Sequence, residues 1–147
     1  DFEGDTLMGR DKRVRIVSFV DRRSGYLIAF LLPKMNAQLL TSLAWKYFKC
    51  IPQKKRKTVT LDNGVEFSDW ERLEMKSGMT IYFAYPYHAW ERGTNENTNG
   101  LLRQYFPKSH DFNHITPAEL AQVVKQLNNR ERKRLGFLSP RRVFWKK

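Results

Sequence analysis

An uninterrupted apolar run, YLIAFLL (26–32), restricts the fold of this chain more than any other segment. Strands that are buried on both faces contain such runs, because neither face needs polar side chains. Residues 15–21 (RIVSFVD) form a second apolar segment, and RRSG (22–25) between the two has the composition of a turn. Residues 2–8 alternate large with small or polar side chains, as in a strand with Asp5 on one face. We therefore predict an antiparallel meander of three strands, with 26–32 as a central strand covered on both faces.

The rest of the chain alternates between predicted helices and strands. Asn36 and Thr116 are residue types that cap the N-terminus of a helix, and Gly78 is the residue type that commonly follows a helix C-terminus. The first helix should turn one apolar stripe inward, formed by Leu39, Leu40, Leu43, Ala44 and Tyr47. Strands are expected at 58–62 and 79–85, and helices at 36–49, at 65–77, at 94–106, from 117 and from 140. This order predicts an α/β fold: a mixed five-stranded sheet, made of the meander plus two parallel strands, with helices on both faces.

The charge of the chain indicates its class of partner. Its 147 residues predict one domain, and they carry a formal net charge of +12. That excess favours polyanions, nucleic acid first and an acidic membrane surface second; a basic soluble protein without such a partner is the alternative. No run approaches the roughly 18 apolar residues of a membrane span. The single cysteine, Cys50, excludes an internal disulfide and a multi-cysteine zinc site, and we expect it to be a small packed residue.

Three acidic residues lie where they could share a site. Asp5 is in the first predicted strand, Asp62 ends the fourth, and Glu96 is in the first turn of the helix at 94–106. Asp5 and Asp62 become neighbours if their strands pair in parallel, and the helix at 36–49 is the crossover that such pairing requires. Mg²⁺ prefers oxygen ligands, and grouped carboxylates can hold two ions for phosphoryl transfer. The spacing alone also fits an ordinary turn at Asp62 and an acid that complements the helix dipole at Glu96.

Basic, aromatic and amide residues around these acids are candidate DNA contacts. The loop PYHAWERGT (86–94) could orient DNA beside the acids, although its aromatic side chains could equally pack on the domain. The basic run KKRK (54–57) is either a solvated bend or a DNA contact. Arg103 shares a helix face with Glu96 and could bind a phosphate. The candidates are Asn63, Trp90, Arg92, Asn95, Asn99, Arg103, Lys108 and Arg130.

Several of these segments closely resemble one family of enzymes. The segments are DNGVEF (62–67), YFAYPYHAWERGTNENTNGLLRQYFPK (82–108) and LNNRERKRLGFLSPRRVF (127–144), with a shorter match in EGDTLMG (3–9). They resemble the bacterial insertion-sequence transposases of family thirty, which are Asp-Asp-Glu transposases related to retroviral integrases. The resemblance implies a ribonuclease-H-like fold and a metal-binding catalytic triad of Asp5, Asp62 and Glu96. The 33 residues between Asp62 and Glu96 also suit that family. The chain departs from the family at Glu131, where relatives usually have proline, and this leaves DNA contacts there in doubt.

The function implied by the resemblance is cleavage and joining of DNA. Two Mg²⁺ or Mn²⁺ ions would assist hydrolysis at an element end, and the freed 3′-hydroxyl would then attack a target strand. The alternatives are a ribonuclease-H-like nuclease that cuts without joining and an inactive, domesticated DNA-binding module. The expected partners are element ends, target DNA and further copies of the chain, in a bacterial cytoplasm and on the nucleoid through DNA. No ATP-binding loop is present, so ATP use is not expected. We expect residues 1–147 to be one integrase-like catalytic core cut from a longer transposase, without the family's N-terminal helix-turn-helix region.

Overall fold

The structure is a computed structural model, which describes residues 1–62, 64–84 and 93–146. Its elements follow the predicted order of three strands, a helix, a strand, a helix, a strand and three helices. The strands are β1 (Phe2–Met8), β2 (Arg15–Asp21), β3 (Leu27–Leu32), β4 (Thr58–Leu61) and β5 (Thr80–Phe83). The α-helices are α1 (Ala37–Phe48), α2 (Trp70–Ser77), α3 (Gly93–Tyr105), α4 (Pro117–Asn129) and α5 (Pro140–Phe144). None of the helices in these ranges is both long and apolar enough to cross a membrane.

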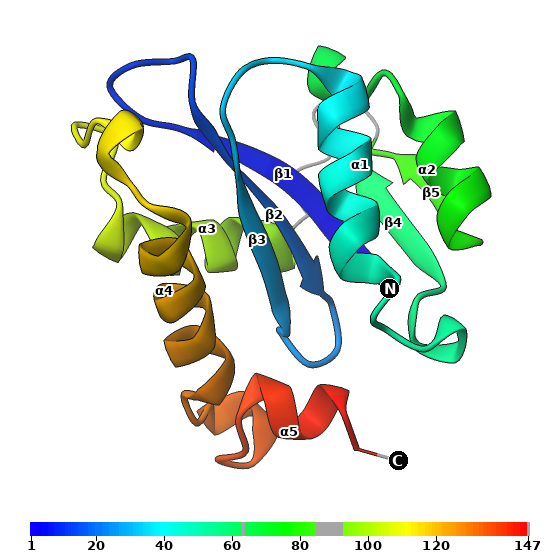
Figure 1. The fold of residues 1–147 in the computed structure, drawn as a ribbon. Helices are drawn as coiled ribbons and strands as arrows, with labels where there is room; N and C mark the ends of the chain where they lie inside the picture. Colours follow the sequence, from blue (N-terminus) through cyan, green and yellow to red (C-terminus); the bar gives the residue numbers. More distant parts are fainter. Residues whose placement is uncertain (63, 85–92, 147) are drawn as a thin grey trace.

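The sheet combines antiparallel and parallel pairs, as predicted (Figure 1). Its strand order is β3-β2-β1-β4-β5, with antiparallel pairing along the meander and parallel pairing from β1 to β4 and from β4 to β5. The prediction that 26–32 is a central strand is wrong, because β3 lies at the edge of the sheet. The apolar run is explained by the faces of the strand, which α1 and α4 cover.

Helices cover both faces of the sheet, and each face has its own apolar core. Alternation along β2 divides the two: Val17 and Phe19 join the core under α1, α2 and α5, whereas Ile16 joins the core under α3 and α4. Ser18 also points to the α3 face, where it bonds to that helix. Helices thus cover the meander on both faces, and α3 packs against β1 and β2.

Three local predictions need correction. Phe48, not Tyr47, completes the buried stripe of α1, and Tyr47 is partly exposed while its ring stacks on Phe30 at 5.4 Å. Cys50 is exposed rather than packed, since it follows the end of α1. The helix predicted at 65–77 is interrupted: residues 65–67 form a 3-10 turn whose Glu66 and Phe67 turn inward, and α2 begins only at Trp70.

The side-chain amide of Asn128 on α4 bonds to the backbone of the edge strand β3, as the backbone of a neighbouring strand would. Its side-chain oxygen accepts from the N–H of Leu27 at 2.8 Å, and its Nδ2 donates to the carbonyl of Leu27 at 2.9 Å. Both groups of Leu27 are buried, so they have no water to replace this partner.

Asn128→Ala should therefore lower the free energy of unfolding by about 2–3 kcal/mol, since it leaves two buried backbone groups unpaired. Asn129→Ala is the matched control, because the next side chain is exposed and should change stability by less than about 0.5 kcal/mol. Urea unfolding of both variants measures the difference. Equal midpoints would show that Asn128 does not secure β3.

Candidate active site

Asp5 lies on β1, and Asp62 directly follows β4, the neighbouring parallel strand. Phe2 pairs with Val59 and Glu3 with Thr60, so continuing this register by two residues sets Asp5 beside Asp62, just beyond the paired stretch. The Asp5 carboxylate accepts from the N–H of Thr6 at 2.8 Å and from Asn99 Nδ2 at 3.0 Å. The Asp62 carboxylate accepts from the N–H of Gly64 at 3.0 Å. Both side chains are held by hydrogen bonds just beyond the paired stretch of β1 and β4.

Glycine at position 4 lets β1 carry acids on one face while its other face meets the core. A β-carbon there would lie 2.6 Å from Leu61 Cδ2 and 2.8 Å from Phe19 Cε1, both of which belong to the core under α1. The side chains of Glu3 and Asp5, on either side of Gly4, therefore face α3. A larger residue at position 4 would displace the buried side chains of Leu61 and Phe19.

Glu3 connects β1 to the beginning of α3. Its side chain is almost fully buried; one oxygen accepts from the N–H of Asn95 at 3.3 Å and the other pairs with Arg22 Nε at 3.2 Å. An anion next to the N-terminus of a helix complements the helix dipole. Arg22 continues to β4, where its Nη2 donates to Thr60 Oγ1 at 3.2 Å. Glu3 thus fixes the first turn of α3, which carries Glu96, against the strand that carries Asp5.

Ser18 and two asparagines complete the contacts that position α3 on the sheet. Ser18 Oγ lies 3.4 Å from Asn95 Oδ1 and 3.3 Å from Asn99 Oδ1, so β2 contacts two successive turns of the helix. Asn95 is fully buried, whereas Glu96, the next residue, is exposed. The helix is therefore fixed through Asn95 and Asn99, and the carboxylate of Glu96 is presented outward.

Glu66 braces the turn that follows Asp62. Its carboxylate accepts from Thr6 Oγ1 at 2.9 Å and lies 3.5 Å from Arg15 Nη1, which joins the turn to both β1 and β2. The same carboxylate packs against Gly64, where an added β-carbon would lie 2.5 Å from Glu66 Oε2. The Glu66 carboxylate thus lies against Gly64, whose N–H donates to the Asp62 carboxylate.

The donor set suits a hard divalent ion. Carboxylate oxygens are the ligands that Mg²⁺ and Mn²⁺ prefer, and Asp5 and Asp62 present them from adjacent strands. Within residues 1–62, 64–84 and 93–146, no three His, Cys, Asp or Glu side chains gather closely enough to hold a metal. Glu96 is on α3, the helix that packs beside Asp5, but the three carboxylates do not lie close enough together to form one metal site.

The candidate DNA contacts have different surroundings. Asn63, Trp90 and Arg92 lie outside the described residues. The prediction for Asn95 needs correction: its side chain is buried and positions α3. Asn99 is bonded to Asp5, and Arg103 lies over the ring of Phe112 at 5.9 Å, where burial lowers the pKa of its guanidinium. Lys108 and Arg130 are exposed, and Arg130 donates to Tyr105 Oη at 3.0 Å.

Sequence reasoning did not identify Glu3, Ser18 or Glu66 as parts of the site. The signal for Glu3 was its spacing of two residues from Asp5, which puts both acids on one face of a strand. Glu66 lies within DNGVEF, but its partners Thr6 and Arg15 are about 50 to 60 residues away in the chain. Those contacts depend on the sheet order, which the spacing of residues does not reveal.

Comparisons with known proteins show what the chain as a whole is similar to. No family model matches the chain. It is 40% identical to the transposase for insertion sequence element IS4351 of Bacteroides fragilis over 98% of the chain and 44% of that protein. It is 39% identical to transposase InsI for element IS30C of Escherichia coli (strain K12) over 97% of the chain and 37% of that protein. The chain thus spans less than half the length of these relatives.

The fold has a close counterpart among solved structures. The crystal structure of the catalytic core domain of BIV integrase superposes with a TM-score of 0.73 at 20% identity, covering 97% of this chain and 91% of that one. Over nearly its whole length the chain is therefore homologous to the IS30-family transposases, and its mixed five-stranded fold is the ribonuclease-H-like fold of an integrase catalytic core.

Proposed function

We propose that this chain is the catalytic core of a transposase, which cleaves a DNA strand and transfers the freed end to a target strand. The observation that carries the proposal is the parallel register that sets Asp5 beside Asp62, under a helix whose first turn presents Glu96. The relatives are transposases for insertion sequences. Residues 1–147 would form one core within a longer protein, acting in the bacterial cytoplasm on nucleoid DNA.

Asp5, Asp62 and Glu96 would hold two Mg²⁺ or Mn²⁺ ions. Such ions increase the reactivity of an attacking oxygen and stabilise the leaving oxygen of a phosphodiester. The chain's own part is to hold the Asp5 and Asp62 carboxylates in place and to keep the first turn of α3 beside β1. Thr6 and Asn99 orient Asp5, Gly64 orients Asp62, and Glu3 holds the start of α3 beside them. No side chain needs to form a covalent bond with DNA, and DNA ends, target DNA and further copies of the chain would be the partners.

Cleavage and joining by the purified chain test the proposal. Incubation with Mn²⁺ should nick supercoiled plasmid, and a labelled oligonucleotide with a free 3′-hydroxyl should become joined to that plasmid. Nicking without joined product would favour a nuclease that only cuts. Failure to nick together with failure to bind Mn²⁺, measured by electron paramagnetic resonance, would overturn the proposal and leave a DNA-binding module.

A further inference from the structure

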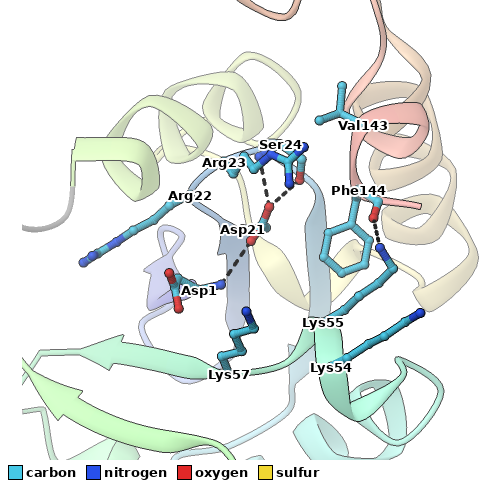
Figure 2. A pocket seen from close by; sticks show the side chains of 10 residues that line it. All are labelled: Asp1, Asp21, Arg22, Arg23, Ser24, Lys54, Lys55, Lys57, Val143 and Phe144. Carbon is cyan, nitrogen blue, oxygen red and sulfur yellow. Dashed lines mark hydrogen bonds and ion pairs between the residues drawn. The ribbon is translucent and has the colours of Figure 1, made fainter. Parts of the chain in front are cut away.

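A basic hollow lies at the opposite end of β4 from Asp62. Its volume is about 430 Å³, and Figure 2 shows its walls: the turn between β2 and β3, the basic run before β4, and the end of α5. Five cations line it, namely Arg22, Arg23, Lys54, Lys55 and Lys57. They come from two segments that are about thirty residues apart in the chain, so the fold, not one charged run, makes this cluster.

The structure divides the basic run KKRK (54–57) into two parts. Arg56 turns inward: it donates to the carbonyls of Ser77, Phe48 and Ile51, and its guanidinium lies 5.2 Å from the ring centre of Trp45. Lys54, Lys55 and Lys57 face the hollow instead. Part of the run is therefore structural, and the rest is concentrated around one cavity.

Three of the five cations that line the hollow have no side-chain partner among the described residues. Arg22 pairs with Glu3, and Lys55 donates to the carbonyl of Phe144 at 2.7 Å. The side chains of Arg23, Lys54 and Lys57 are exposed and make no hydrogen bond or ion pair with another described residue. Four cations other than Arg22 thus stand against two carboxylates.

Those two carboxylates are themselves engaged elsewhere. Asp21 accepts from the backbone N–H and hydroxyl of Ser24 at 2.9 and 2.6 Å, and Asp1 accepts from Thr58 Oγ1 at 2.6 Å. Asp21 also pairs with the amino group of Asp1 at 3.3 Å. These bonds leave the charge of both carboxylates in place, so the four cations exceed the two carboxylates by two charges. The hollow is therefore suited to an anion with several oxygen acceptors.

Arg22 connects this hollow to the candidate active site. Figure 2 shows its side chain extending away from Phe144. It bonds to Glu3 and Thr60, which pair with each other across β1 and β4 two residues before Asp5 and Asp62. Beyond Thr60 on the same face, β5 presents Thr80 and Tyr82, which are exposed. Among the described residues, the exposed Thr80 and Tyr82 leave this part of the sheet accessible to a ligand that spans from the acids to the hollow.

We propose that the hollow binds a backbone phosphate of the DNA whose scissile bond lies at Asp5 and Asp62. Lys57 precedes Asp62 by five residues of extended chain, roughly 17 Å at 3.3 Å per residue. DNA rises 3.4 Å per nucleotide of one strand, so the bound phosphate is about five nucleotides from the cleaved bond. Naming DNA as the source of the phosphate rests on the proposed function. Lysine and arginine contacts to phosphates position DNA without reading its sequence.

The test compares two triple variants of equal charge. The hollow variant carries Arg23→Gln, Lys54→Gln and Lys57→Gln; the control carries Lys12→Gln, Lys34→Gln and Lys76→Gln, three exposed residues outside the hollow. Affinity for a 30-base-pair duplex is measured by fluorescence anisotropy in EDTA over a series of salt concentrations. Because all six side chains are exposed, both proteins should keep the melting temperature of the parent chain.

The hollow variant should bind at least tenfold more weakly at 0.1 M salt, with a salt-dependence slope smaller by about two to three. The control should lose less than threefold in affinity, with its slope changed by less than about one. Equal losses in the two variants would overturn the inference, and so would a hollow variant that loses binding only to anionic lipid vesicles. Since the assay contains no metal, a chain that never cuts DNA could still give the expected result. Failure of the proposed function and failure of this inference are therefore distinguishable.

Discussion

Glu96→Gln should abolish metal-dependent DNA cleavage while leaving the chain folded. The side chain is exposed on the first turn of α3, so its charge is not needed for packing. The amide keeps the shape of the side chain but removes the negative charge that a divalent ion requires. We expect the rate of Mn²⁺-dependent nicking to fall by about a thousandfold or more, as when one member of a catalytic group acting as a unit is removed. The melting temperature should stay within about 1 °C of the parent chain.

Glu119→Gln is the matched control. Glu119 is also an exposed acid in the first turn of a helix, α4, so the substitution makes the same chemical change at an equivalent place. It should leave nicking unchanged. Asp62→Asn should behave like Glu96→Gln, since asparagine can still accept from the N–H of Gly64 and keep the turn. Equal nicking by Glu96→Gln and the parent would mean that Glu96 is not part of the metal site, and an equal loss in Glu119→Gln would indicate a general effect of charge.

The element order and the parallel pairing of β1 with β4 could be predicted because signals within each segment indicate them. Apolar runs, turn residues and caps mark where elements begin and end, and a helix between two strands favours a parallel crossover. The edge position of β3 could not be predicted in this way. An apolar run reports that both faces of a strand are covered, but it does not report what lies beside the strand, and here Asn128 of α4 takes that place.

The residues that position the acids could be predicted far less well. Glu3 and Asn95 are 92 positions apart, and Glu66 and Thr6 are 60 apart, so each contact exists only once the sheet has formed. Tyr47 and Phe48 differ by one helical position, and a stripe with apolar residues on both sides does not decide which of them turns inward. The sequence thus leads to the three acids as a prediction, and the structure was needed to find the network around them.

Glu66→Ala should destabilise the chain more than any substitution of an exposed acid. Glu66 and Arg15 form an ion pair with side chains only 10% and 15% exposed, and Arg15 Nε is buried with no hydrogen-bond partner among the described residues. Removing one member of such a pair leaves a buried charge uncompensated, which costs about 3–5 kcal/mol. For a chain of this size, that corresponds to a fall of roughly 6–20 °C in melting temperature. Glu71→Ala, at an exposed acid on α2, should change stability by less than about 0.5 kcal/mol.

A double variant separates the lost charge pairing from the lost packing. If the cost of Glu66→Ala comes from the stranded guanidinium, adding Arg15→Met should restore at least half of the lost stability, because replacing both charges with apolar groups is often nearly neutral. If the cost comes from the space that the Glu66 side chain leaves next to Gly64, the double variant should be no more stable than the single one. Nicking then shows whether the pair also serves the site. Because Glu66 packs against the turn that orients Asp62, cleavage should stay low in the double variant even where stability returns. Full recovery of cleavage together with stability would show that Glu66 supports the fold alone and that Asp62 is positioned without it.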